Sequence, residues 1–140
     1  MIDALFHQVR DFHLLMDQPA PDAPTMQTVD LIERRMNWID SEQQELRDAR
    51  TVEDQADAYI DITYFALGGL VELGVIPGEL WWLAHNANMA KVWEDGRPRK
   101  MPDGKIIKPA GWVDPTPAQK RAVIAQIIST PLRFEAQEAR

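Results

Sequence analysis

The chain contains no cysteine among its 140 residues. This absence excludes a disulfide framework, a zinc site built from thiolates and a cysteine nucleophile. It agrees with residence in a reducing compartment, where disulfide bonds are rare.

Long apolar runs are also absent, because Glu72 and several glycines interrupt the best candidate. We therefore expect no membrane span and no membrane partner. The first residues, which include Asp3 and His7, do not have the basic and then apolar form of a signal peptide. Together with the missing cysteines, these features predict a cytoplasmic protein.

Positive charge is scarce, with 15 lysines and arginines against 22 aspartates and glutamates, and the net charge is -7. This balance argues against a nucleic-acid partner, since the phosphate backbone is bound mainly by basic residues. Many of the basic residues fall in one segment, residues 91–108: Lys91, Arg97, Arg99, Lys100, Lys105 and Lys108. An acidic body with one basic segment favours a small polyanionic ligand.

Helical periodicity is what the sequence has in abundance. Apolar residues recur at helical spacing and predict helices over residues 2–17, 26–50, 52–73 and 78–92, with a last helix from Thr116. Thr51 is the predicted N-cap of the third helix, and Gly74 is its predicted end. Between residues 93 and 115 we expect a long loop with two short strands. The pattern predicts an all-α antiparallel helical bundle with a long basic loop before the last helix. We expect this bundle to be a single domain over residues 1–130, followed by a frayed tail over residues 131–140.

A row of carboxylates runs along the third predicted helix. Asp54, Asp57 and Asp61 lie three, four and seven positions apart, so their side chains share one line on the helix. The residues around Asp61 are mostly apolar, and we expect this helix to be nearly buried. A buried carboxylate is costly unless a cation or a hydrogen-bond donor replaces its water. A bound metal is the leading candidate for that cation.

Glu42 and Glu45 add a second pair of carboxylates, on the helix that comes before. The short break near residues 50–51 predicts that the two helices pack as an antiparallel hairpin. Counting outward from that turn places Glu45 opposite Asp57 and Glu42 opposite Asp61. Two facing carboxylate pairs are a common way to bind hard cations.

These residues occur in an order that resembles a known family. The motifs are Glu42-x-x-Glu45, Asp57-Ala-Tyr-Ile-Asp61, Asn88-Met-Ala-Lys91, Asp95-Gly-Arg-Pro and Asp103-Gly-Lys-Ile-Ile-Lys108-Pro. Over roughly residues 5–115 the chain resembles the all-α nucleoside triphosphate (NTP) pyrophosphohydrolases. This superfamily includes MazG-like, dimeric-dUTPase-like and phosphoribosyl-ATP pyrophosphohydrolase-like proteins. The resemblance implies a bundle of the MazG-like type.

The resemblance also implies the site residues and the cofactor. The implied metal ligands are Glu42, Glu45, Asp57 and Asp61, and the implied metal is Mg²⁺, with Mn²⁺ as the alternative. Glu45 and Glu42 are the implied catalytic residues, Glu45 as a base for the attacking water. The implied substrate-binding residues are Asn88, Lys91, Lys105 and Lys108.

The chain departs from the family pattern at two positions. Ser41 stands where the family commonly has the first of two adjacent glutamates, and Ala58 occupies the glutamate position that precedes Asp61. Asp57 then substitutes for that glutamate. A second alignment takes Asp54 and Asp57 as the ligands, so two ligand pairs stay open on the third helix.

The implied reaction converts a nucleoside or deoxynucleoside triphosphate to the monophosphate and pyrophosphate, by attack of water on the α-phosphorus. Overall resemblance to short phage-type members favours dGTP or GTP, and would place a phage-encoded chain in the host cytoplasm. The alternatives are the same reaction on dUTP or dCTP, and a non-catalytic helical interaction module. The apolar surface of the third and fourth helices exceeds what one hairpin can bury, which predicts a homodimer or homotetramer.

Overall fold

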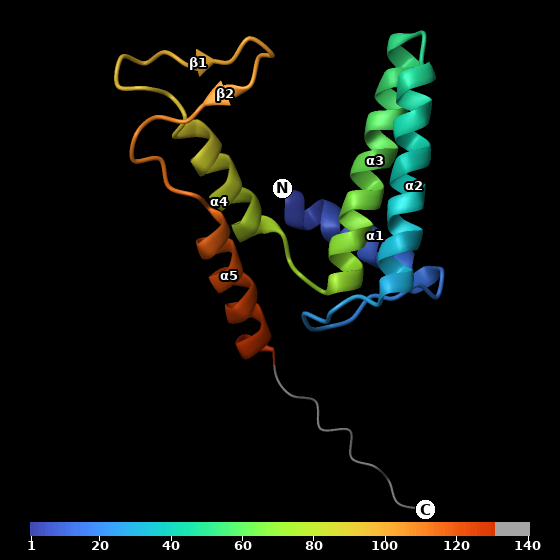
Figure 1. Cartoon of the computed structure of the whole chain (residues 1–140). Coiled ribbons are helices and arrows are strands. Elements are labelled where there is room, and N and C mark those ends of the chain that lie inside the picture. The colour runs from blue at the N-terminus through green and yellow to red at the C-terminus, as the bar shows by residue number, and fades with distance from the viewer. Residues whose placement is uncertain (131–140) are drawn as a thin grey trace, which may run out of the picture.

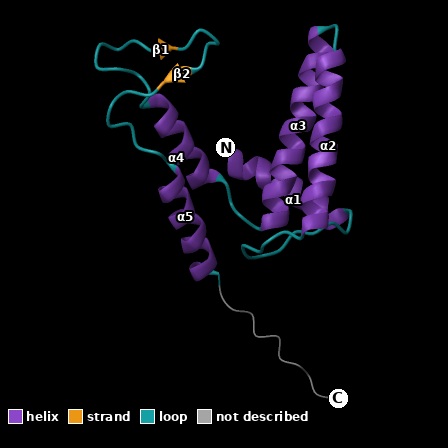
Figure 2. Cartoon of the chain, viewed as in Figure 1, coloured by secondary structure: helices purple, strands orange, loops and turns teal. Residues whose placement is uncertain are grey.

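The computed structural model describes residues 1–130, and the tail predicted over residues 131–140 lies outside the described part. Within residues 1–130, five helices follow one another: α1 (Ile2–Leu15), α2 (Val29–Asp48), α3 (Val52–Leu73), α4 (Gly78–Met89) and α5 (Thr116–Ser129). Between α4 and α5, β1 (Arg99–Lys100) pairs antiparallel with β2 (Ile106–Ile107). Figure 2 shows how small this hairpin is beside the helices. The all-α prediction is confirmed, and so are the two short strands.

The long hairpin of α2 and α3 is the largest feature of the fold, and its ends are set by local residues (Figure 1). Thr51 caps α3, since its hydroxyl oxygen accepts the N–H of Asp54 at 3.1 Å. Gly74 ends α3 in the left-handed conformation, at a φ of 63°. α2 begins at Val29, later than predicted, because Thr28 caps it by accepting the N–H of Leu31 at 3.3 Å.

The other helix ends differ from the prediction by a few residues. α2 ends at Asp48 before the predicted residue 50, and α4 ends at Met89 before the predicted residue 92. α1 ends at Leu15 before the predicted residue 17, because Asp17 takes a φ of 52°, outside the helical region. None of these helices, all of them in the described part of the chain, is both long and apolar enough to cross a membrane.

The buried core lies where α1 crosses the hairpin, near the C-terminal end of α3. Phe6 and Val9 of α1 pack there against Leu67 and Val71 of α3. His13 is buried beside this core, and its Nδ1 lies 2.9 Å from the carbonyl oxygen of Pro19. This histidine therefore has a packing role, as expected for a histidine outside any metal-binding pattern.

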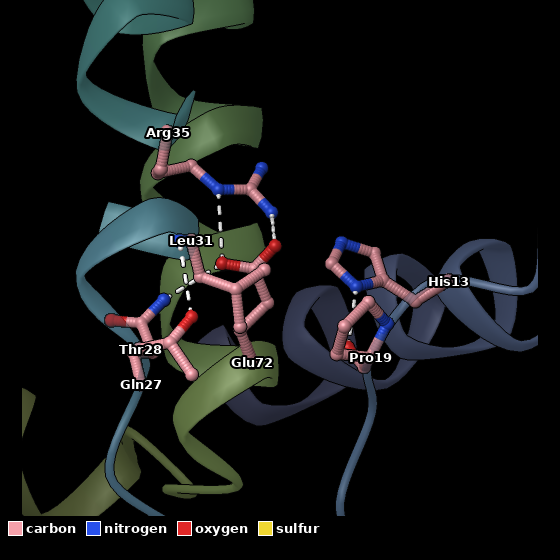
Figure 3. Close-up of polar contacts among 7 residues, drawn as sticks. All are labelled: His13, Pro19, Gln27, Thr28, Leu31, Arg35 and Glu72. Atoms are coloured by element: carbon pink, nitrogen blue, oxygen red, sulfur yellow. Dashed lines mark hydrogen bonds and ion pairs between the residues drawn. The ribbon is translucent and has the colours of Figure 1, made fainter. Parts of the chain in front are cut away.

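A buried ion pair joins α2 to α3 next to this core. Arg35 is 7% exposed and Glu72 is 5% exposed. Arg35 donates to Glu72 from Nε, at 3.4 Å, and from Nη2, while Gln27 donates to the same carboxylate at 2.7 Å (Figure 3). The guanidinium also packs against Gly68, where a Cβ atom would lie 2.5 Å from Arg35 Nη1. Only glycine leaves room for this approach.

The helices α4 and α5, with the hairpin between them, form an arm that lies apart from α2 and α3 (Figure 1). The two helices run antiparallel, because Leu80 near the start of α4 accepts a bond from Gln119, while Ala87 near its end accepts one from Trp112. The side chain of Gln126 holds the arm's base through two bonds of 2.9 Å to the backbone of Ile76. Within residues 1–130, α4 contacts α1, and neither α4 nor α5 contacts a helix of the long hairpin.

The prediction that the third helix is nearly buried is wrong for the single chain. Tyr59 is 60% exposed and Ile60 is 65% exposed. On α4, Trp81 is 55% exposed and Trp82 is 60% exposed. The physical reason is the position of the arm. It turns away from α3, so within residues 1–130 no second layer covers these apolar side chains.

Candidate functional site

The predicted carboxylates occupy facing helices of the long hairpin. Glu42 and Glu45 belong to α2, whereas Asp57 and Asp61 belong to α3. Partial burial raises the pKa of Glu42, and the negative charges of Glu45, Asp61 and Asp57 raise it further. The other three carboxylates are therefore close enough to Glu42 to act on it electrostatically.

Within the described part of the chain, no basic side chain forms an ion pair with these carboxylates. The ion pairs found among residues 1–130 join Arg10 to Asp22, Arg35 to Glu72 and Arg99 to Asp95, and none involves the four carboxylates. Unpaired carboxylates gathered on one surface attract a cation, and their oxygen atoms are the ligands that Mg²⁺ and Mn²⁺ prefer. The chemistry of the donor set thus fits a hard divalent cation.

The carboxylates are not already gathered at coordination distance. Across residues 1–130, no group of three or more histidine, aspartate or glutamate side chains is close enough to hold a metal ion. Two carboxylates of α3, Asp57 and Asp61, act on Glu42 across the hairpin. The choice between the ligand pair Asp57 and Asp61 and the alternative pair Asp54 and Asp57 stays a prediction.

The raised pKa of Glu42 has a measurable consequence in the absence of metal. Because the folded-state pKa lies above the unfolded value, ionised Glu42 destabilises the fold, and this penalty disappears as pH falls through the folded pKa. We expect Glu42→Gln to raise the Tm by about 1–3 °C at neutral pH, with little gain near about pH 4. Thermal unfolding in EDTA at both pH values measures this difference. Glu33→Gln, on the exposed side of the same helix, is the control, and equal shifts for both variants would contradict the prediction.

The predicted substrate-binding residues lie on the arm, at the end of α4 and in the loop that follows. Lys91 Nζ donates to Asn88 Oδ1 at 2.6 Å. Lys108 Nζ lies 3.9 Å from the centre of the Trp112 ring, and Lys91 Nζ lies 5.7 Å from the same point. Asn88, Lys91 and Lys108 are thus brought together, whereas no contact joins Lys105 to them. In Figure 1 the arm stands away from α2 and α3, so one chain does not bring these residues to the carboxylates.

Sequence reasoning missed two groups of interacting residues, one beside the core and one on the arm. The first is the buried pair Arg35 and Glu72, for which a signal existed: Glu72 stands between Val71 and Leu73 in an apolar stretch. The second is Trp112, whose ring contacts both lysines. No local pattern indicated that contact, because Lys91 and Trp112 are far apart in the sequence.

Comparison with known proteins agrees with the fold described above. The sequence model of the family described as phosphoribosyl-ATP pyrophosphohydrolase matches residues 9–88, a span that includes all four carboxylates and Asn88. A crystal structure of a candidate NTP pyrophosphohydrolase from Exiguobacterium sp. 255-15 is 26% identical in sequence, with a TM-score of 0.50. The similarity covers 88% of this chain and 96% of that protein. No curated protein sequence matches significantly.

The helical fold and the two comparisons agree with the all-α NTP pyrophosphohydrolase superfamily. Because the family match extends over more than half of its length, the chain belongs to the phosphoribosyl-ATP pyrophosphohydrolase family. The match ends before Lys91, Lys105 and Lys108, so the basic loop and α5 lie beyond the matched region.

Proposed function

We propose that the protein is a Mg²⁺-dependent nucleoside triphosphate pyrophosphohydrolase that releases the monophosphate and pyrophosphate. The observation that carries the proposal is the electrostatic effect of Glu45, Asp61 and Asp57 on Glu42. Within residues 1–130, none of these four carboxylates forms an ion pair. Family membership and the similarity to the Exiguobacterium protein support the same reaction class. Mn²⁺ is the alternative metal for these oxygen ligands.

The four carboxylates would hold the metal, which when bound neutralises phosphate charge and favours ionisation of water. Glu45 acts as the general base and takes one proton from the attacking water. The water oxygen forms a bond to the α-phosphorus, and the bond from that phosphorus to the bridging oxygen breaks. Pyrophosphate leaves with the electron pair of the broken bond. Glu42 contributes a negative charge that keeps the metal at this face of the hairpin.

The proposal includes self-association as a homodimer or homotetramer. Tyr59, Ile60 and Trp82 expose apolar surface that a second copy would bury. A second copy could also bring the arm's Lys91 and Lys108 toward the carboxylates of the first, which the arm of the same chain does not reach. Light scattering coupled to size-exclusion chromatography measures the number of subunits.

Among substrates we place dGTP or GTP first, because of the chain's overall resemblance to short phage-type members. The testing experiment incubates the protein with a panel of NTPs and dNTPs and Mg²⁺, and separates the products by chromatography. Monophosphate and pyrophosphate from a guanine nucleotide support the full proposal, whereas the same products from dUTP or dCTP would change only the base. Diphosphate and phosphate would contradict attack at the α-phosphorus. No turnover with Mg²⁺ or Mn²⁺ would favour a non-catalytic helical interaction module.

A further inference from the structure

Two lysines of the arm share a single aromatic ring. Lys108 Nζ and Lys91 Nζ lie 3.9 Å and 5.7 Å from the centre of the Trp112 ring. Because both distances are measured from the same ring centre, the two ammonium groups lie within about 10 Å of each other. This separation is roughly one Debye length at 0.1 M salt. Two like charges at this separation repel, and the π face of tryptophan offsets part of that repulsion. The arrangement is poised to receive an anion.

The ring itself is held in place by the backbone of α4. Trp112 Nε1 donates to the carbonyl oxygen of Ala87 at 2.6 Å, and its backbone N–H donates to Pro109 at 3.2 Å. The Lys91 ammonium also donates a hydrogen bond to Asn88 Oδ1 at 2.6 Å. A lysine side chain normally loses much rotational freedom when it binds a phosphate. Here that freedom is already restricted before any ligand binds.

The positive charges of the two lysines are not neutralised by ion pairs among the described residues. Neither Lys91 nor Lys108 forms an ion pair within residues 1–130. The Asp114 carboxylate interacts electrostatically with Lys108. Its Oδ1, however, already accepts the N–H of Thr116 at 2.8 Å, at the start of α5. The other tryptophan of the loop differs in this respect. The Cζ atom of Arg99 lies 5.1 Å from the centre of the Trp93 ring. The same guanidinium forms an ion pair with Asp95, with 2.8 Å between Nη2 and Oδ2.

We propose that Trp112 is a positioning residue whose ring holds the ammonium groups of Lys91 and Lys108 together as a preformed site for the polyphosphate of the nucleotide. The inference rests on the proposed function for the identity of the ligand. It assigns to Trp112 a role in binding the charged phosphates and no role in the attack on the α-phosphorus. The expected kinetic signature is therefore a change in KM with kcat unchanged.

The first test measures binding of inorganic tripolyphosphate to the full chain by titration calorimetry, without divalent metal. Trp112→Leu removes the ring, and we expect the Kd to rise about tenfold. Trp112→Phe keeps an aromatic face but loses the bond to Ala87, and we expect its Kd to stay within about threefold of the original. If the bond to Ala87 were the essential feature, the phenylalanine variant would be as weak as the leucine variant. That result would overturn the proposal.

Trp93→Leu is the matched control, because Trp93 is in the same loop and also anchors to backbone, donating to Ile107 at 3.3 Å. We expect it to leave the Kd for tripolyphosphate within about threefold, since its cationic partner is already neutralised. An equal loss in the Trp93 and Trp112 variants would indicate general disturbance of the loop and overturn the proposal. So would a wild-type protein that does not bind tripolyphosphate.

Failure of this inference and failure of the proposed function are distinguishable. If the wild-type protein hydrolyses a nucleotide but Trp112→Leu changes neither KM nor tripolyphosphate binding, only the role of Trp112 is overturned. If tripolyphosphate binding depends on Trp112 while no nucleotide is hydrolysed, the polyphosphate site stands and the proposed reaction fails. In the supporting case, KM for the nucleotide rises in Trp112→Leu by about the same factor as the Kd.

Discussion

Replacing Asp61 with asparagine is expected to lower kcat by about a thousandfold or more, with an apo Tm at least as high as that of the original protein. The substitution keeps the size of the side chain and removes one of the negative charges that repel Glu42. It therefore weakens the proposed metal site while it relieves electrostatic repulsion in the fold. Turnover assays with Mg²⁺ and thermal unfolding in EDTA measure the two effects separately.

Asp54→Asn is the matched control, because Asp54 lies on the same line of α3, two turns before Asp61. We expect this variant to keep most of its activity if Asp57 and Asp61 are the ligands. A large loss in Asp54→Asn, with Asp61→Asn still active, would instead identify Asp54 and Asp57 as the pair. Full activity in both variants would mean that the site lies elsewhere.

Glu72→Ala is expected to destabilise the fold by about 3–5 kcal/mol, because it leaves the buried Arg35 guanidinium without its counter-charge. For a domain of this length, that loss corresponds to a fall in Tm of about 10 °C or more. Gln27 also loses its bonding partner, which adds to the cost. Chemical denaturation followed by circular dichroism gives the free energy of unfolding directly.

Two further variants separate the buried charge from the loss of packing. The double variant Arg35→Met with Glu72→Leu removes both charges and keeps apolar volume, so it should recover most of the lost stability. Asp95→Ala breaks the exposed pair with Arg99 and should cost about 0.5 kcal/mol or less. A Glu72→Ala protein as stable as the Asp95→Ala protein would show that the buried pair does not hold α2 to α3.

Several features of the fold could be predicted because their causes lie within a few residues of one another. Thr51 and Gly74 bound α3 as predicted, since a cap depends only on the adjacent turn. The two short strands expected between residues 93 and 115 are present, and Arg99 pairs with Ile107. The convergence of Glu42 with Asp57 and Asp61 followed from equal distances to one short turn.

The sequence by itself therefore determined the helices, the hairpin and the approximate placement of its carboxylates. Tertiary structure alone decided three other features: the buried pairing of Arg35 with Glu72, the direction of the arm, and the meeting of two lysines at Trp112. The first and third join residues that are distant in the sequence, and hydrophobic periodicity carries no information on such pairings. The direction of the arm depends on the backbone between α3 and α4, and a small rotation there moves the whole arm. For that reason the local pattern overestimated the burial of α3 and did not reveal that the lysines and the carboxylates lie on separate parts of the chain.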